Sequence, residues 1–317
     1  MADPAGRLMS RGRVFLLTAL AMLAFAGNSL LCRAALHGGS GIDAATFTSV
    51  RIVAGAAALW LIVRVRDGRV VLAGNWPSAL ALFAYAAAFS FAYVGLTAAT
   101  GALLLFGAVQ ATMIGVGLVR GERLAAAQLL GLACASAGLV DLLLPGLSAP
   151  PLTSALLMLA AGFAWGVYSL RGKGGGDPLR VTAGNFLRAV AFAAALSALT
   201  LSVASIDVAG IAYAIASGAL ASGVGYAVWY SALPALKVAS AATVQLTVPV
   251  IAAIGGMALL GEPPTLRFLI ASVAILGGIA LVIGRRSVAL PETRRSDLSV
   301  QEPGRRQPVE KAPEARH

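Results

Sequence analysis

Apolar segments of about 20 residues follow one another along most of this 317-residue chain. A helix of that length crosses a bilayer core of about 30 Å, and the residue alternation of membrane strands is absent from these segments. The sequence therefore predicts an all-α membrane protein with ten transmembrane helices. The expected helices cover residues 14–35, 44–64, 76–97, 99–119, 124–144, 152–171, 181–203, 210–236, 238–260 and 265–284.

The composition agrees with a membrane location. Hydrophobic residues make up 59% of the chain, charged residues only 12%, and the mean hydropathy is +0.85, well outside the range of soluble domains. The first apolar run is longer than the core of a signal peptide and lacks a clean cleavage site, so we expect it to remain as a spanning helix. Residues 1–13 are expected to form a cytoplasmic tail, and the polar residues 285–317 a disordered cytoplasmic tail.

Basic residues predict the orientation, because they tend to stay on the cytoplasmic side of a membrane. With the N-terminus inside, the far side receives Arg33 and Arg267. The cytoplasmic side receives Arg7, Arg11, Arg13, Arg64, Arg66, Arg69, Arg120, Arg123, Arg171, Lys173, Arg180, Lys237, Arg285 and Arg286. We therefore expect a bacterial cytoplasmic-membrane protein with both termini inside the cell. The net charge of +11 then reflects topology and anionic lipid headgroups, and no nucleic-acid partner is expected.

A repeated unit relates the two halves of the chain. Residues 99–122 match residues 239–262 at a constant offset of 140 positions, and both copies end on Gly-Glu before another apolar run. Five helices per unit is an odd number, so the second unit would enter the membrane from the opposite side. The sequence predicts two inverted five-helix repeats, at 14–144 and 152–284. Many secondary transporters are built this way, with the substrate near the midplane.

Particular motifs in both halves carry a resemblance to a known family. In the first half they are Phe25-Ala-Gly-Asn28, Arg51, Tyr93-Val-Gly-Leu-Thr-Ala-Ala99 and Gly121-Glu122-Arg123-Leu124. In the second half they are Trp165-Gly166, Arg188, Tyr230-Ser-Ala-Leu-Pro-Ala-Leu236 and Gly261-Glu262-Pro263. Over residues 11–284 the chain resembles the drug/metabolite transporter superfamily in its ten-helix EamA form, and within it the YddG-type amino-acid exporters. It departs from the family pattern at Ala26, where Trp is usual, and at Val109, where Pro is common.

Aromatic side chains well inside the predicted helices are candidates for lining a substrate cavity. Rings can stack on an amphipathic ligand while their polar tips make single hydrogen bonds. The alternative is packing against lipid or in an interfacial belt. The candidates are Tyr85, Phe89, Trp165, Tyr168 and Trp229.

Amides inside the predicted helices are a second group of candidates, because an unpaired amide in hydrocarbon is costly and should face the bundle interior. The substrate-binding candidates are Asn28, Gln110 and Gln245, and Asn185 shares the same setting. Hydrogen bonding between helices is the alternative role for each amide. Pro234 and Pro249 interrupt backbone hydrogen bonding and are the expected hinges.

Charged residues near the membrane core leave alternatives open. Arg51 and Arg188 occupy repeat-related positions, and each either binds backbone carbonyls as a structural residue or meets a substrate carboxylate. Glu122 and Glu262 are interpreted as helix-start charges for the 124–144 and 265–284 helices.

The remaining acidic residues and the histidines also constrain function. All Asp and Glu are expected in joints or tails, and His37 and His317 lie outside the spans, so no buried group is left to relay a proton. We therefore expect facilitated diffusion rather than proton coupling, and no cationic drug substrate. No metal, cofactor or enzymatic activity is expected, because catalytic constellations and metal-ligand spacings are absent.

These observations favour a transporter of small amphipathic metabolites, with amino acids, including aromatic ones, as the leading substrate class. A nucleobase, a sugar derivative or a lipid-linked substrate is the alternative within the transporter class. An intramembrane enzyme or a purely structural protein is the alternative outside it. The expected partners are a small-molecule substrate and the lipid bilayer, and a monomer is favoured over an oligomer.

Overall fold

The computed structural model describes residues 9–37, 41–68, 73–121, 124–146, 149–172, 176–236 and 238–285. This part of the chain is helical without strands, and ten of its helical spans are long and apolar enough to cross a membrane. The predicted all-α fold with ten spans is confirmed. The first half contains α1 (Arg11–His37), α2 (Ala44–Asp67), α3 (Trp76–Tyr93), α4 (Ala98–Val119) and α5 (Ala126–Leu143). The second half contains α6 (Leu152–Arg171), α7 (Pro178–Thr200), η1 (Leu201–Val203), α8 (Val208–Ile215), η2 (Ala216–Val224), α9 (Gly225–Ala232), η3 (Leu233–Ala235), α10 (Val238–Gln245), α11 (Thr247–Leu260) and α12 (Leu266–Arg285).

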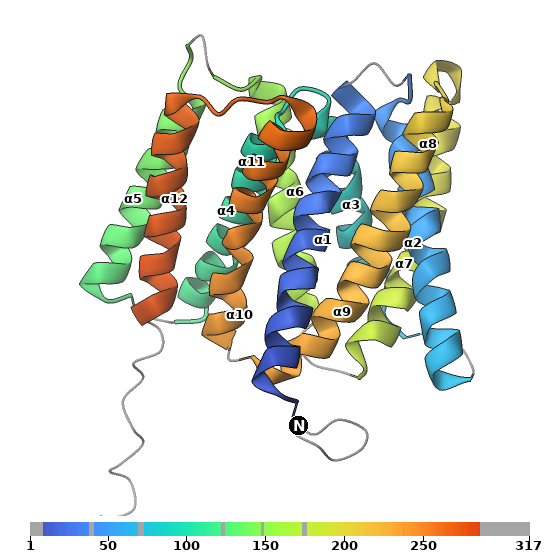
Figure 1. The fold of residues 1–317 in the computed structure, drawn as a ribbon, viewed down its shortest axis with the longest axis horizontal. Coiled ribbons are helices and arrows are strands. Elements are labelled where there is room, and N and C mark those ends of the chain that lie inside the picture. The colour runs from blue at the N-terminus through green and yellow to red at the C-terminus, as the bar shows by residue number, and fades with distance from the viewer. Residues whose placement is uncertain are drawn as a thin grey trace, which may run out of the picture.

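The helices stand side by side in one bundle, and α1 begins at the end of the bundle where α12 ends (Figure 1). Helices α5 and α12 form a pair at one edge, while α2, α7 and α8 lie toward the opposite edge. Between them, α3 and α4 pack against α6, and α1 packs against α9 and α11. The middle of the bundle therefore combines helices from both halves of the chain.

Short polar residues start several of these helices. The Asp43 carboxylate accepts hydrogen bonds from the backbone N–H groups of Ala45 and Thr46 at 2.9 Å, and so caps α2. It also accepts the N–H of Ser205, which joins this helix start to the connection before α8. Burial raises the pKa of the Asp43 carboxyl, but the hydrogen bonds from Thr46, Ser205 and Ala45 lower it by a larger amount. The pKa of Asp43 therefore lies below its ordinary value.

Two of the predicted helices are interrupted. The 210–236 segment passes from α8 through the π-helix η2 into α9 and ends in the 3₁₀ turn η3. The 238–260 segment breaks at Leu246, between α10 and α11. Pro249 explains this break, because it has no N–H to donate to the carbonyl of Gln245 and its ring would clash there.

The ends of the chain differ slightly from prediction. Helix α1 begins at Arg11, so residues 11–13, which the sequence places in the N-terminal tail, are helical. Helix α12 includes Arg285, and residues 286–317, where a disordered tail is predicted, lie outside the described residues.

Glycines allow α5 and α12 to approach closely. A Cβ added at Gly131 would lie 2.6 Å from the carbonyl oxygen of Gly278, and one added at Gly138 would lie 2.7 Å from Cβ of Ala274. The neighbouring Gly277 has nothing within 4 Å of an added Cβ and does not take part in this contact. The tight contact therefore depends on the backbone at Gly131, Gly138 and Gly278.

We expect Gly278→Ala to lower the free energy of unfolding by about 1–3 kcal/mol, because its methyl group would overlap the Gly131 carbonyl oxygen and push the two helices apart. Gly277→Ala is the matched control. It makes the same change in helix propensity one residue away, in open space, and should be neutral or stabilising. Denaturation of both variants in mixed detergent micelles measures the difference, and equal stabilities would contradict the assigned contact.

Candidate substrate site

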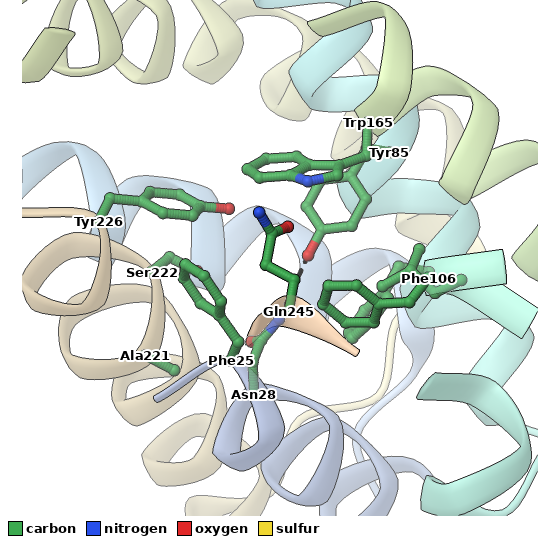
Figure 2. Close-up of a pocket in the computed structure, with 11 residues that line it drawn as sticks. Phe25, Asn28, Tyr85, Phe106, Trp165, Ala221, Ser222, Tyr226 and Gln245 are labelled. Carbon is green, nitrogen blue, oxygen red and sulfur yellow. Dashed lines mark hydrogen bonds between the residues drawn. The ribbon is translucent and has the colours of Figure 1, made fainter. Parts of the chain in front are cut away.

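A cavity of about 30 Å³ lies between helices of both halves of the bundle. Figure 2 shows the side chain of Gln245 pointing toward Trp165, between Tyr85 and Tyr226. The cavity is lined by Phe25 and Asn28 of α1, Tyr85 and Phe89 of α3, Leu105 and Phe106 of α4, Trp165 of α6, Ala221 and Ser222 of η2, Tyr226 of α9 and Gln245 of α10.

Aromatic rings in contact with one another form much of the cavity wall. The rings of Trp165 and Tyr226 are nearly parallel, with an interplanar angle of 17° and centroids 5.3 Å apart. The centroid of Tyr85 lies 4.8 Å from that of Trp165, and Phe25 lies 5.8 Å from Tyr226. These contacts join α3, α6 and α9, with α1 beside them, so the wall is shared between the two halves of the chain.

A chain of hydrogen bonds fixes the polar side of the cavity. The hydroxyl of Ser217, in the π-helix η2, donates to Oδ1 of Asn28 at 2.6 Å. Nδ2 of Asn28 in turn donates to the hydroxyl oxygen of Tyr85 at 3.3 Å. The wider turns of the π-helix thus bring η2 against α1 at this level, a common use of π-helical segments at functional sites.

The volume of the cavity limits what it holds in this conformation. A space of about 30 Å³ accommodates a few water molecules, whereas small-ligand pockets start at about 300 Å³. The aromatic side chains of the wall pack on one another and so fill most of the space between the helices. A substrate of amino-acid size therefore requires these walls to separate.

Arg51 lies directly behind this wall. It is 2% exposed, its Nη2 donates to the Tyr85 hydroxyl at 3.0 Å, and its Cζ lies 4.8 Å from the centroid of Phe89 and 5.3 Å from that of Tyr85. Each cation–π contact contributes about 0.5–2 kcal/mol, whereas removing an ion from water costs several kcal/mol. The rings therefore only partly offset the burial of this charge.

The structure brings together five of the eight predicted substrate-binding residues: Asn28, Tyr85, Phe89, Trp165 and Gln245 line the cavity. Three others lie outside its lining. Gln110 is buried on α4, and the Tyr168 hydroxyl donates to Thr182 at 3.4 Å. Trp229 meets Phe25 edge to face, with centroids 6.0 Å apart, and so supports the wall from behind.

Arg188 binds backbone carbonyls, as expected for one of the two roles that the sequence left open. Its Nη1 donates to the backbone carbonyls of Ala73 at 2.7 Å and Gly184 at 2.9 Å. Asn185 is used in a similar way, since its Oδ1 accepts the N–H of Asn75 at the start of α3. These residues join α7 to α3 and lie outside the cavity lining.

The two prolines occupy different settings. Pro249 is buried in the first turn of α11, directly after the break that leaves Gln245 at the cavity. Pro234 lies in the short 3₁₀ turn η3 at the end of its helical span and is exposed. The break in the spanning helix itself is thus associated with Pro249, and the hinge role of both residues stays a prediction.

Six lining residues were not among the predicted site residues: Phe25, Leu105, Phe106, Ala221, Ser222 and Tyr226. Two of them had a sequence signal. Phe25 belongs to the motif that precedes Asn28, and Tyr226 shares a helical face with Trp229. Ala221 and Ser222 reach the cavity from the π-helix, which simple helical periodicity does not predict.

Glu262 corrects the sequence interpretation. Its Oε1 lies 2.6 Å from Nε of Arg33, and its Oε2 accepts the N–H of Ala98 at 2.9 Å, so it caps α4 rather than α12. The Thr265 hydroxyl instead accepts the N–H of Phe268 at the start of α12. Glu262 is therefore a largely buried, paired carboxylate, with its side chain 12% exposed. Glu122, its predicted counterpart, lies outside the described residues.

The prediction that all acidic residues lie in joints or tails fails at two positions, Asp67, the last residue of α2, and Asp141. Asp141 belongs to the last turn of α5, where its backbone carbonyl accepts from Arg267. No group of three His, Cys, Asp or Glu side chains within the described ranges is arranged to hold a metal ion.

A larger hollow of about 250 Å³ lies among the connections at the end of the bundle where α1 ends. Its lining comes from the α3–α4, α5–α6 and α11–α12 connections and the helix ends next to them, and includes four prolines, three threonines, several apolar side chains and Glu262. The Glu262 carboxylate is already bonded to Arg33 and Ala98, and the hydroxyls of Thr97, Thr100 and Thr265 take part in hydrogen bonds at the starts of α4 and α12, so the polar groups of the hollow are already paired. The ring-lined cavity is the better candidate site.

Comparison with known proteins identifies the family. Residues 152–284, which run from α6 to α12, match the EamA-like transporter family. The chain belongs to the EamA-like transporter family. The Pseudomonas aeruginosa protein named "Uncharacterized protein PA1977" is 60% identical over 275 residues, which cover 86% of this chain and 96% of that protein. A solved crystal structure matches with a TM-score of 0.59 at 21% identity, covering 86% of this chain and 98% of that one, and supports the fold alone.

As an EamA-like transporter, the protein is a multi-pass membrane transporter of small molecules. The resemblance to the drug/metabolite transporter superfamily is confirmed. The YddG-type branch stays a prediction, as does the choice of substrate.

Proposed function

We propose that this EamA-like transporter exports small amphipathic metabolites, with amino acids, including aromatic ones, as its substrates. One observation carries the proposal: the stacked rings of Trp165 and Tyr226, with the tilted ring of Tyr85 beside them, line a cavity with a few uncharged polar groups. Such rings suit an apolar or aromatic side chain, and the amide and hydroxyl groups of Asn28, Gln245 and Ser222 can orient its polar end.

The packing of the bundle supports two inverted repeats at 14–144 and 152–284. Under exchange of the halves, the contact of α3 with α6 corresponds to that of α9 with α1, and the contact of α4 with α6 to that of α11 with α1. Helices α2 and α7 contact each other, as do α5 and α12. Alternating access would arise from rocking of these halves around the cavity.

The interruptions next to the cavity support the same mechanism. The π-helix η2 and the break at Leu246 lie in the two second-half spans that contribute Ser222 and Gln245 to the wall. Backbone hydrogen bonding is already altered at both places, so the walls can separate there with fewer bonds to break.

The opposite orientation of the halves gives a direct prediction. Single cysteines at Gly121 and Gly261, in a background without Cys32 and Cys134, should react with a membrane-impermeant thiol reagent from opposite sides. Gly121 should be accessible from the cytoplasm of the bacterial cell and Gly261 from outside, with both termini in the cytoplasm. Labelling of both cysteines from one side would contradict the inverted topology.

Uptake into proteoliposomes tests the substrate class. Labelled phenylalanine, tryptophan and leucine should enter down their gradients faster than into protein-free vesicles. Uracil and a sugar phosphate represent the alternative substrates, and uracil is the sharper competitor because stacked rings also accept planar bases. Faster entry of uracil, with no amino-acid entry, would replace the proposal by nucleobase transport.

Transport should not consume a proton gradient. The described cavity lining contains no carboxylate or imidazole, the side chains that commonly relay protons inside a membrane. An imposed pH gradient should therefore not raise internal phenylalanine above its equilibrium level. Uphill accumulation that collapses with a protonophore would contradict this, and Glu262 would become the first residue to replace.

A further inference from the structure

Arg51 differs from the other arginines that are withdrawn from solvent in this bundle. Arg33 pairs with Glu262, and Arg188 binds two backbone carbonyls. Arg51 is almost completely buried, yet no carboxylate of the described chain forms an ion pair with it. Its Nη1 is also buried without a hydrogen-bond partner among the described residues. A buried charge left in this state lacks its counter-ion.

The hydroxyl of Tyr85 connects Arg51 to the cavity. Its oxygen accepts from Nη2 of Arg51 at 3.0 Å and from Nδ2 of Asn28 at 3.3 Å. A guanidinium can only donate, and Ser217 orients the Asn28 amide by donating to its oxygen. With both lone pairs of the Tyr85 oxygen occupied, its hydrogen is the part left to interact with a ligand.

We infer that the Tyr85 hydroxyl, backed by Arg51, binds the carboxylate of the transported substrate. The inference deepens the proposed function, because it takes the ring-lined cavity as the transport site. Tyr85 lines the cavity directly, whereas Arg51 lies behind it and acts through Tyr85 as a positioning residue. The ligand class is a monocarboxylate on an apolar or aromatic body, and amines without a carboxylate are excluded by the positive charge.

A purely structural role makes a different prediction. If Arg51 served only to hold α2 to α3 through the rings of Tyr85 and Phe89, its loss would lower stability without changing ligand preference. The decisive readout is therefore the preference between ligands that differ only in charged group. Two such compounds are 3-phenylpropionate, which has a carboxylate and no amine, and phenethylamine, which has an amine and no carboxylate.

The experiment measures both compounds as competitors of labelled phenylalanine in proteoliposomes, and as ligands that raise the thermal unfolding temperature of the purified protein. In the wild type, phenylpropionate should act at concentrations at least about tenfold lower than phenethylamine. Arg51→Gln and Tyr85→Phe should bring this ratio close to one, and Arg51→Lys should keep most of it. Arg188→Lys is the matched control and should leave the ratio unchanged, because Arg188 binds carbonyls outside the cavity.

The two readouts separate the inference from the proposed function. If no amino acid is transported but phenylpropionate stabilises the wild type and not the Arg51→Gln variant, the amino-acid proposal fails and the carboxylate subsite stands. If amino acids are transported and Arg51→Gln keeps the wild-type ratio, the subsite is wrong. The carboxylate subsite would also be wrong if the wild type responded equally to both compounds, or responded to neither of them. Should Arg51→Gln fail to fold, Tyr85→Phe decides, since it keeps the ring on which Arg51 packs.

Discussion

Replacing Glu262 by glutamine should lower the free energy of unfolding by about 3–5 kcal/mol, the cost of leaving a buried charge without its partner. The side chains of Arg33 and Glu262 are 6% and 12% exposed and meet at 2.6 Å. Arg33 also donates to the backbone carbonyl of Tyr93, so the uncompensated charge would stay in place rather than reach water. The same substitution weakens the cap on the N–H of Ala98. Unfolding by SDS in mixed micelles measures the effect.

A second ion pair of the same length provides the control. Arg66 and Asp177 also meet at 2.6 Å, but their side chains are 39% and 32% exposed. Asp177→Asn should change the free energy of unfolding by less than about 1 kcal/mol, because water screens this pair and asparagine can still cap α7. Similar losses for Glu262→Gln and Asp177→Asn would mean that burial of the Arg33 pair has no energetic importance.

Trp165→Ala should raise the KM for tryptophan uptake by about tenfold or more. The indole of Trp165 stacks on Tyr226 and contacts Tyr85. Its removal therefore deletes the ring that connects Tyr226 of α9 to Tyr85 of α3. Aromatic pairs contribute about 0.5–1.5 kcal/mol each beyond the area they bury, and 1.4 kcal/mol corresponds to tenfold in affinity. Trp165→Phe should retain part of the affinity, because one aromatic face remains.

Trp60→Ala is the matched control for this prediction. Trp60 belongs to α2 and is 43% exposed on the outside of the bundle, away from the cavity lining. Its replacement should leave the KM within about twofold of the wild type, since an exposed surface change usually has a small effect. An unchanged KM in Trp165→Ala would assign Trp165 to helix packing alone.

Much of this architecture could be predicted from the sequence, because a bilayer restricts a spanning chain to helices of nearly fixed length. Five cavity residues were also found in this way. Asn28 and Gln245 are amides that hydrocarbon would penalise, and Tyr85, Phe89 and Trp165 lie deep in their segments. In each case the physical reason for burial is local to one helix, and a single sequence therefore contains it.

The remaining features depend on how distant helices meet. The bonds from Glu262 to Arg33 and Ala98 join residues 229 and 164 positions apart, and no local pattern predicts such a pairing. Tyr226 enters the cavity while Trp229, on the same predicted face, packs behind Phe25. The π-helix η2 changes the direction of side chains along its span, so a regular 3.6-residue period misplaces Ser222.

Counterflow in proteoliposomes is the most direct test of uncoupled amino-acid transport by alternating access. Vesicles loaded with unlabelled phenylalanine are diluted into a trace of labelled phenylalanine at equal pH on both sides. The labelled compound should accumulate transiently above its external concentration and then decline, without any ion gradient, because a carrier that alternates between two openings exchanges substrate across the membrane. If the protein is folded and inserted but none of phenylalanine, tryptophan and leucine shows this transient accumulation, uncoupled amino-acid transport is contradicted.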